Sequence, residues 1–163
     1  MSTEKNLKDA FAGESQANRK YLAFAQKAEE EGYPAVAKLF RAASEAEAIH
    51  AYSELRALGA IKSTAENLQA AIEGETYEFT NMYPGFIKEA EEEGATQAKR
   101  AFSLASDAEK VHADLYKKAL ELLESKPDTE YYLCTVCGYI HENEAPDKCP
   151  VCGAGSKAFK NVG

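Results

Sequence analysis

The four-residue pattern Glu-x-x-His occurs twice in this chain, at Glu47 and His50 and again at Glu109 and His112. Side chains three residues apart on an α-helix point the same way, so each copy directs one carboxylate and one imidazole into the same space. Two such pairs, joined by single glutamates from two further helices, form the ligand set of bundles that hold two metal ions. The repeated pattern therefore predicts four helices whose metal-ligating side chains face one another.

The periodicity of the apolar residues supplies these four helices. Apolar residues recur at helical spacing over 4–31, over 35–58 and over about 96–124. A further helix begins at a capping box formed by Ser63 and Glu66 and continues towards residue 94. Pro84 is expected to kink this helix, because proline lacks a backbone N–H and clashes with the preceding turn. We predict an all-α four-helix bundle.

The two halves of the predicted bundle repeat each other. The sequence Ala-Glu-Glu-Glu-Gly of 28–32 returns at 90–94, at the offset that also relates the two Glu-x-x-His pairs. The Gly-Glu-Ser of 13–15 returns as the Gly-Glu-Thr of 74–76, but one residue out of step. Chance similarity between helices rich in alanine and glutamate would not preserve the spacing of Glu and His. The repeat predicts two similar hairpins that face each other across a pseudo-symmetric site.

Charge and chain length narrow the class of protein. The net charge of −8 argues against a nucleic-acid partner and against binding to an anionic membrane. No apolar run approaches the ~18–20 residues that span a bilayer, and no secretory signal is recognisable, so we expect a cytoplasmic protein. Helical periodicity stops at 126–128, which predicts a bundle over 1–125 and a metal-binding domain over 126–163. The second part is too small to build a core without a metal.

Five glutamates fall on the inward faces of the helices. Buried carboxylates without a counter-charge are prohibitively unstable, and no Lys or Arg recurs on these faces, so two iron ions are the expected counter-charge. Glu47 and Glu109 would bridge both metals at about 3.5–4 Å separation, with Glu14 and Glu75 as terminal ligands. Glu78 is one carboxylate more than this minimal set needs.

Glu78 lies one turn beyond Glu75, and in a closed bundle it would lie across from His50. A site with both side chains can offer an oxygen ligand to ferric iron and a nitrogen ligand to ferrous iron, which is a hypothesis about catalysis. Tyr21 and Tyr83 each lie two turns after a terminal glutamate. They either donate hydrogen bonds to the carboxylates or are ordinary aromatic core residues.

The four cysteines form two Cys-x-x-Cys pairs, Cys134 with Cys137 and Cys149 with Cys152. Pairs clustered this closely in a cytosolic protein indicate metal ligands rather than disulfides. Four thiolates in a tetrahedron bind either one iron or one zinc. Beside a redox-active two-metal site, iron is favoured, with a structural zinc as the alternative. His141 is nearby, but the four thiolates already complete the coordination.

With these motifs together, the chain resembles the rubrerythrin family over essentially its full length. The residues that carry the resemblance are Gly13-Glu14-Ser-Gln-Ala, Glu47-x-x-His50, Glu75-Thr-Tyr-Glu78-Phe, Met82-Tyr83-Pro84, Glu109-x-x-His112, Cys134-x-x-Cys137-Gly-Tyr and Cys149-Pro-x-Cys152-Gly. The resemblance implies a ferritin-like four-helix bundle with a rubredoxin-like domain. It implies a peroxidase that reduces hydrogen peroxide to water. Electrons would arrive through the FeS4 centre from a reductase or a rubredoxin, and ultimately from a reduced pyridine nucleotide.

The resemblance also assigns roles to individual residues. The expected iron ligands are Glu14, Glu47, Glu75, Glu78, Glu109 and His112, with His50 binding in the reduced state. Tyr21 and Tyr83 are the expected hydrogen-bonding tyrosines.

The connection between the second and third helices departs from the usual ferritin-like pattern. Ferritin-like bundles need a long crossover at this point, but residues 59–63 reach at most ~18 Å when extended. A helix of ~25 residues is close to 40 Å long, so this segment cannot return along its own bundle. The chain therefore forms either a plain up-down bundle or a homodimer that exchanges its helical hairpins. We favour the exchanged homodimer.

Other functions fit part of the pattern. An oxygen-reducing oxidase or ferroxidase would use the same ligands and is the nearest enzymatic alternative. A ferritin-like iron-binding and storage protein would need a cage with entry pores, which nothing in the sequence predicts. A zinc-ribbon interaction module on an inert bundle would leave the buried glutamates and histidines unexplained.

Overall fold

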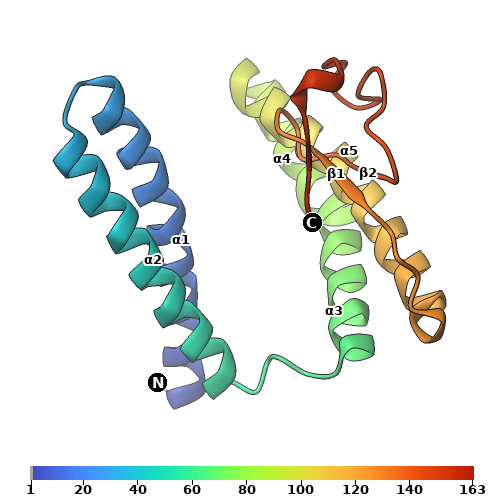
Figure 1. Cartoon of the computed structure of the whole chain (residues 1–163), viewed down its shortest axis with the longest axis horizontal. Helices are drawn as coiled ribbons and strands as arrows, with labels where there is room; N and C mark the ends of the chain where they lie inside the picture. Colours follow the sequence, from blue (N-terminus) through green and yellow to red (C-terminus); the bar gives the residue numbers. More distant parts are fainter. Residues whose placement is uncertain (1) are drawn as a thin grey trace. The chain divides into compact units, whose positions relative to one another are not determined.

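The computed structural model describes residues 2–163, and the chain divides into two compact units. The first unit ends at Lys62, and the second is Ser63–Gly163. The first is a hairpin of two helices, and the second is a helical hairpin that also carries a small β-sheet (Figure 1). The predicted boundary at residues 125 and 126 falls within the second unit, between its last long helix and the sheet. Within residues 2–163 no helix is long and apolar enough to cross a membrane.

The first unit consists of α1 (Thr3–Glu30) and α2 (Pro34–Ala57), which lie side by side (Figure 1). Alanines buried between the two helices allow their backbones to approach closely. A polar contact also fixes their relative position. The Asn18 side-chain amide donates to the carbonyl of Ser44 at 2.7 Å, and the Ser44 hydroxyl donates to the carbonyl of Asn18 at 2.9 Å. The turn between the helices uses Gly32 at φ +81°, a conformation that favours glycine.

The helical part of the second unit has α3 (Thr64–Tyr77), η1 (Glu78–Met82), α4 (Tyr83–Glu92) and α5 (Thr96–Glu121). The capping box predicted at the start of α3 is present, with reciprocal side-chain and backbone hydrogen bonds. Together with α1 and α2, these elements confirm the four predicted helical stretches.

A π-helical segment, η1, interrupts the third helical stretch just before Pro84. The backbone stays helical through it, and the N–H of Tyr83 donates to the carbonyl of Glu78, five residues earlier. The stretch from 74 to 90 is one residue longer than its counterpart from 13 to 28 in the first hairpin. A π turn takes up one residue more than an α turn. The segment therefore accounts for the repeat being one residue out of step, and it lies where Pro84 was expected to disturb the helix.

Both hairpins contain the same aromatic cluster, which supports the internal repeat. In each cluster a tyrosine and two phenylalanines pack with ring centroids between 5.5 and 6.3 Å apart. The clusters are Tyr21, Phe24 and Phe40 in the first hairpin and Tyr83, Phe86 and Phe102 in the second.

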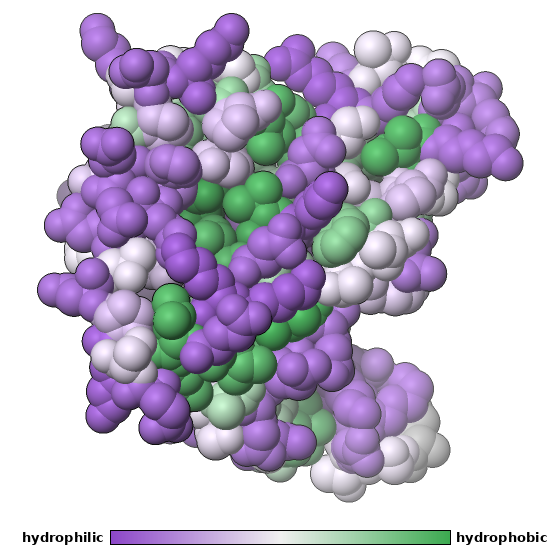
Figure 2. Space-filling view, turned by 90° about the vertical axis from the view of Figure 1, so that its right-hand side faces the viewer, coloured by the Kyte–Doolittle hydropathy of each residue, from purple (hydrophilic) through white to green (hydrophobic). Residues whose placement is uncertain are grey.

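The sheet of the second unit is antiparallel, with strand order β2-β1-β3. Its strands are β1 (Tyr131–Cys134), β2 (Ile140–Glu142) and β3 (Phe159–Asn161). The short 3₁₀ segments η2 (Leu123–Ser125) and η3 (Ser156–Ala158) precede β1 and β3. Its small core of Cys134, Tyr139 and Cys149 is packed against Val111 of α5. Figure 2 views the side on which α5 and the sheet lie in Figure 1, where apolar side chains reach the surface between polar ones.

Candidate metal centres

The first hairpin brings Glu14 of α1 together with Glu47 and His50 of α2. One ligand atom from each of the three lies within 4.8 Å of the others. Nδ1 of His50 lies 2.9 Å from a carboxylate oxygen of Glu47 and 4.0 Å from one of Glu14. The His50 side chain is 56% exposed, so this group lies open at the surface of its hairpin.

The second hairpin builds the matching group from Glu75 of α3 with Glu109 and His112 of α5. Nδ1 of His112 lies 2.6 Å from Glu109 and 3.8 Å from Glu75. The His112 side chain is only 15% exposed, because the small sheet covers it. Its Nε2 lies 2.8 Å from the carbonyl oxygen of Gly138. That carbonyl fixes the proton on Nε2 and leaves the lone pair of Nδ1 directed at the carboxylates, as a metal ligand requires.

Crowded carboxylates raise one another's pKa in both groups. Burial, followed by the hydrogen bond and charge of Glu109, raises the pKa of Glu75 to about 7. A hydrogen bond with Glu47, followed by burial, raises the pKa of Glu14. Burial and the charge of Glu109 raise the pKa of Glu78. Each group is thus short of positive charge, which a bound cation would supply.

Glu78 lies in η1, close enough to Glu109 for that charge to act on it, but outside the compact three-residue group. Tyr21 and Tyr83 lie in the two aromatic clusters, where each packs against phenylalanine rings and stays partly exposed. Burial, followed by the charges of Glu78, Glu109 and Glu75, raises the pKa of Tyr83, so its hydroxyl also lies near the carboxylates.

Two residues near these groups were missed by the sequence analysis. Tyr116 follows His112 by one helical turn, and burial followed by the charges of Glu75 and Glu109 raises its pKa. Glu54 stands at the corresponding position after His50 in the first hairpin. The available signal was the i, i+4 spacing from each histidine, which places both residues on the ligand face.

The four cysteines form a separate group at one end of the sheet. Sγ of Cys134 lies 3.7 Å from that of Cys152, and Sγ of Cys137 lies 3.6 Å from that of Cys149. A tetrahedral metal with bonds of about 2.3 Å to sulfur requires edges of about 3.8 Å. Four thiolates at these separations therefore fit one tetrahedral metal ion. Gly138 and Gly153, which follow the two pairs, adopt φ of +84° and +77°.

Backbone amides face these sulfur atoms. Burial alone would raise the pKa of Cys134, but hydrogen bonds from the N–H groups of Val136 and Cys137, together with side-chain hydrogen bonds to Cys152 and Cys137, lower that pKa to about 7. Burial raises the pKa of Cys137, although the N–H of Tyr139 opposes the shift. Such amide donors stabilise the thiolate charge that a bound metal ion needs. His141 is half-buried, with Nδ1 at 2.9 Å from the Tyr139 hydroxyl.

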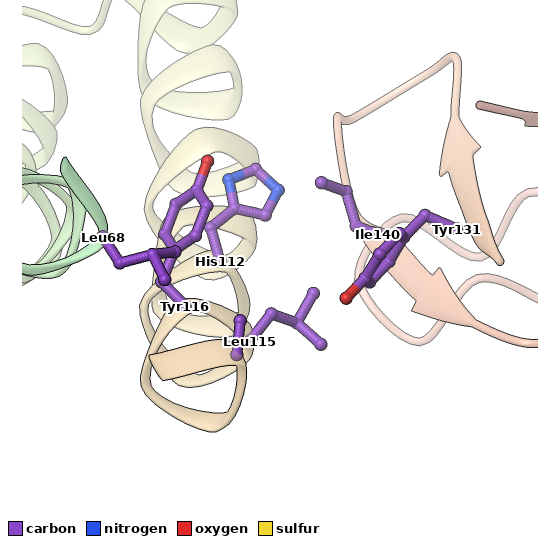
Figure 3. A pocket seen from close by; sticks show the side chains of 7 residues that line it. Leu68, His112, Leu115, Tyr116, Tyr131 and Ile140 are labelled. Atoms are coloured by element: carbon purple, nitrogen blue, oxygen red, sulfur yellow. The ribbon is translucent and has the colours of Figure 1, made fainter. Parts of the chain in front are cut away.

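An apolar cavity of about 300 Å³ lies beside His112, between the helical hairpin of the second unit and the sheet (Figure 3). Its walls come from α3, α5, β1 and β2. The labelled lining residues are Leu68, His112, Leu115, Tyr116, Tyr131 and Ile140. The cavity therefore gives His112 a mostly apolar surrounding.

The two carboxylate–histidine groups and the four-thiolate group define a di-metal carboxylate protein with an additional thiolate centre. The rubrerythrin family model matches residues 5–120, and the model of the rubrerythrin rubredoxin-like domain matches residues 132–160. The chain therefore belongs to the rubrerythrin family.

Relatives and solved structures agree with this assignment. Nigerythrin of Nitratidesulfovibrio vulgaris is 41% identical over 165 residues, which cover 93% of this chain and 82% of the relative. Rubrerythrin of Porphyromonas gingivalis is 38% identical over 92% of this chain and 84% of the relative. The structure of fully reduced, all-ferrous nigerythrin has a TM-score of 0.61 at 39% identity and covers 99% of this chain and 87% of that one.

These findings confirm the predicted fold class, a ferritin-like helical part with a rubredoxin-like C-terminal domain. They also confirm the predicted cofactors, because the Glu and His groups and the four thiolates are consistent with iron. Carboxylate oxygens with imidazole nitrogen suit a di-iron site, and four thiolates suit a single iron.

Proposed function

We propose that this protein is a peroxidase that reduces hydrogen peroxide to water with electrons delivered through its FeS4 centre, as a defence against oxidative stress. The observation that carries the proposal is the double role of His112. Its Nδ1 faces the carboxylates, and its Nε2 donates to the carbonyl of Gly138, the residue directly after Cys137. One hydrogen bond therefore connects a ligand of the carboxylate centre with the residue that directly follows a ligand of the thiolate centre.

When bound, the two ferrous ions supply two electrons that, with two protons, convert hydrogen peroxide into two water molecules, and the FeS4 iron returns these electrons one at a time. The residues that would hold the iron pair are Glu14, Glu47, His50, Glu75, Glu78, Glu109 and His112. A separate reductase or a rubredoxin, using electrons from a reduced pyridine nucleotide, is the proposed donor to the thiolate centre.

We assign His50 and Glu78 to the ligand position that changes with oxidation state. The His50 side chain is exposed on its hairpin, and Glu78 begins a π-helical segment, a geometry that is frequent at functional sites. Tyr21 and Tyr83 are assigned as hydrogen-bond donors that orient the carboxylates in the assembled site.

We also propose that the complete site forms in a homodimer with exchanged hairpins. Each unit of the chain holds one carboxylate–histidine group, and the first hairpin leaves its own group open. Large apolar side chains on α2, including Leu39 at 68% and Ile49 at 67% exposure, also lack cover. In the exchanged dimer the first hairpin of one protomer would cover the second hairpin of the other.

The proposed activity is tested by anaerobic mixing of the fully reduced, iron-loaded protein with either hydrogen peroxide or dioxygen. The return of the ferric FeS4 colour reports the reaction. We expect fast reoxidation by peroxide and slow reoxidation by dioxygen. Faster reaction with dioxygen would make the protein an oxidase or ferroxidase instead.

The electron route is tested with Gly138→Ala, and Gly153→Ala is the matched control. Both glycines have positive φ, so alanine strains each turn by about 1–2 kcal/mol. Only Gly138 offers its carbonyl to His112. We expect slower reoxidation of the FeS4 centre by peroxide in G138A than in G153A, at equal iron content. Equal rates in the two variants would contradict the route through His112.

A further inference from the structure

Glu54 occupies a special place on the ligand face of α2. It lies one helical turn beyond His50 and two turns beyond Glu47, so all three side chains share one side of the helix. Its counterpart in the second hairpin, at the offset that relates the two histidines, is Tyr116. The repeat thus places a carboxylate on one side of the pseudo-symmetric site and a phenol on the other.

The Glu54 carboxylate has an oxygen atom without a hydrogen-bond partner in the described part of the chain. Its Oε2 atom is buried, and it has no hydrogen-bond partner among residues 2–163. A buried carboxylate oxygen without a partner destabilises a fold, and such groups usually have a partner that is a water molecule or an ion, or a role in function. Packing alone would favour leucine at this position. The carboxylate therefore points to a role in the chemistry of the site.

Electrostatics connect Glu54 to the carboxylate group. The pKa of Glu14 is raised by its hydrogen bond with Glu47, by burial and by the charge of Glu47, and the charge of Glu54 adds to these effects while His50 opposes them. The charge of Glu54 therefore acts at Glu14. In the second hairpin the charges of Glu75 and Glu109 act in the same manner on Tyr116.

We propose that Glu54 is a positioning residue of the peroxide-reducing site, holding a water molecule beside Glu14 that carries protons to the reacting oxygen atoms. This inference rests on the proposed peroxidase activity. Reduction of one peroxide breaks the O–O bond and consumes two electrons, supplied by the ferrous pair, and two protons, supplied by solvent. The water held by Glu54 passes each proton on and is reprotonated from solvent. Glu54 itself remains a hydrogen-bond acceptor throughout.

Three variants test this role. Glu54→Leu removes the acceptor and keeps the approximate volume, and Glu54→Gln keeps an amide oxygen that can still hold the water. Glu45→Gln is the matched control, because Glu45 is an exposed glutamate on the same helix. The measurements are thermal unfolding of the metal-free protein, iron content after loading, and the single-turnover rate with peroxide in H2O and in D2O.

We expect E54L to bind iron as the unsubstituted protein does and to react roughly 10- to 100-fold more slowly, since positioned proton transfer contributes about 10²- to 10⁴-fold to enzymatic rates. The solvent isotope effect should increase, and E54Q and E45Q should react at close to the original rate. The metal-free E54L protein should unfold at the same temperature as the unsubstituted protein or higher, because an unpartnered buried oxygen has been removed.

A full rate in E54L would overturn the proposal. Loss of iron from E54L or E54Q would show that Glu54 is a ligand. A lower unfolding temperature of metal-free E54L would show that Glu54 is a structural residue. Either result overturns the positioning role. If the unsubstituted protein does not react with peroxide, the peroxidase function fails first and this role fails with it. If the unsubstituted protein and E54L both react rapidly with peroxide, only the role of Glu54 is refuted and the peroxidase function stands.

Discussion

The exchanged dimer makes a quantitative prediction about mixtures of two inactive variants. Glu47 belongs to the first hairpin and Glu109 to the second, so each of E47A and E109A alone damages every site. In an exchanged dimer that contains one chain of each kind, one site combines both substitutions and the other combines none. Random pairing produces such dimers in half of the population, so about a quarter of all sites should be intact.

The assay is to unfold the two variants together, refold them with iron, and measure peroxide activity and di-iron content per chain. We expect about a quarter of the unsubstituted values, well above the sum of the two variants refolded separately. The matched control is E75A with E109A, because both substitutions lie in the second hairpin and no pairing restores a site. Recovery equal to that of the control would show that each site is built within one chain, and the exchange would be wrong.

Two further predictions concern stability. Glu75 has a pKa raised to about 7 from an ordinary value of 4.5, so between these values the folded metal-free protein holds a proton that the unfolded chain releases. Its contribution to stability is therefore lost as the pH rises through this window. Thermal unfolding in the presence of a chelator should show an unfolding midpoint that falls from about pH 4.5 to 7, and iron loading should abolish this fall. A midpoint that rises over the same range would contradict the raised pKa of Glu75. Ser44→Ala removes the two hydrogen bonds that the buried Ser44 hydroxyl makes with Asn18, although the Asn18 amide keeps its bond to the Ser44 carbonyl. The change should cost about 1–2 kcal/mol in chemical unfolding of the metal-free protein, whereas Ser106→Ala, the same change in the second hairpin, should cost less. Equal losses would show that the contact between the Ser44 hydroxyl and Asn18 contributes nothing.

The helices could be predicted from sequence because their ends carry local chemistry. The capping box at Ser63 and the glycine at position 32 act within a few residues, so local patterns are sufficient to place these ends. The positions of Glu and His followed from helical spacing alone, and the structure brings them together as two groups of three. The cysteine group followed from spacing in the same way.

Other features depend on contacts that spacing does not describe. The contact of His112 with Gly138 joins residues that are 26 positions apart, and it arises only because the small sheet packs on α5. In the sequence Glu54 is one more charged residue of an Ala- and Glu-rich helix, and only the burial of its unpartnered Oε2 atom distinguishes it. Tyr21 and Tyr83 pack in the aromatic clusters, and their hydrogen-bonding role stays a prediction about the assembled site.

The one-residue shift between the two halves was visible in the sequence, but only the π-helical segment of the structure explains it. In the first hairpin Tyr21 follows Glu14 by seven positions, and in the second Tyr83 follows Glu75 by eight. In an unbroken α-helix the extra residue would rotate one of these side chains by about 100° away from its counterpart. The π turn absorbs that rotation, so Tyr83 joins the same aromatic cluster as Tyr21 does, while Glu75 still meets Glu109 and His112. The same segment begins at Glu78, the carboxylate without a counterpart in the first hairpin. One inserted residue therefore accounts for the broken repeat, and Glu78, to which we assign the exchange with His50, lies at the start of the segment that takes it up.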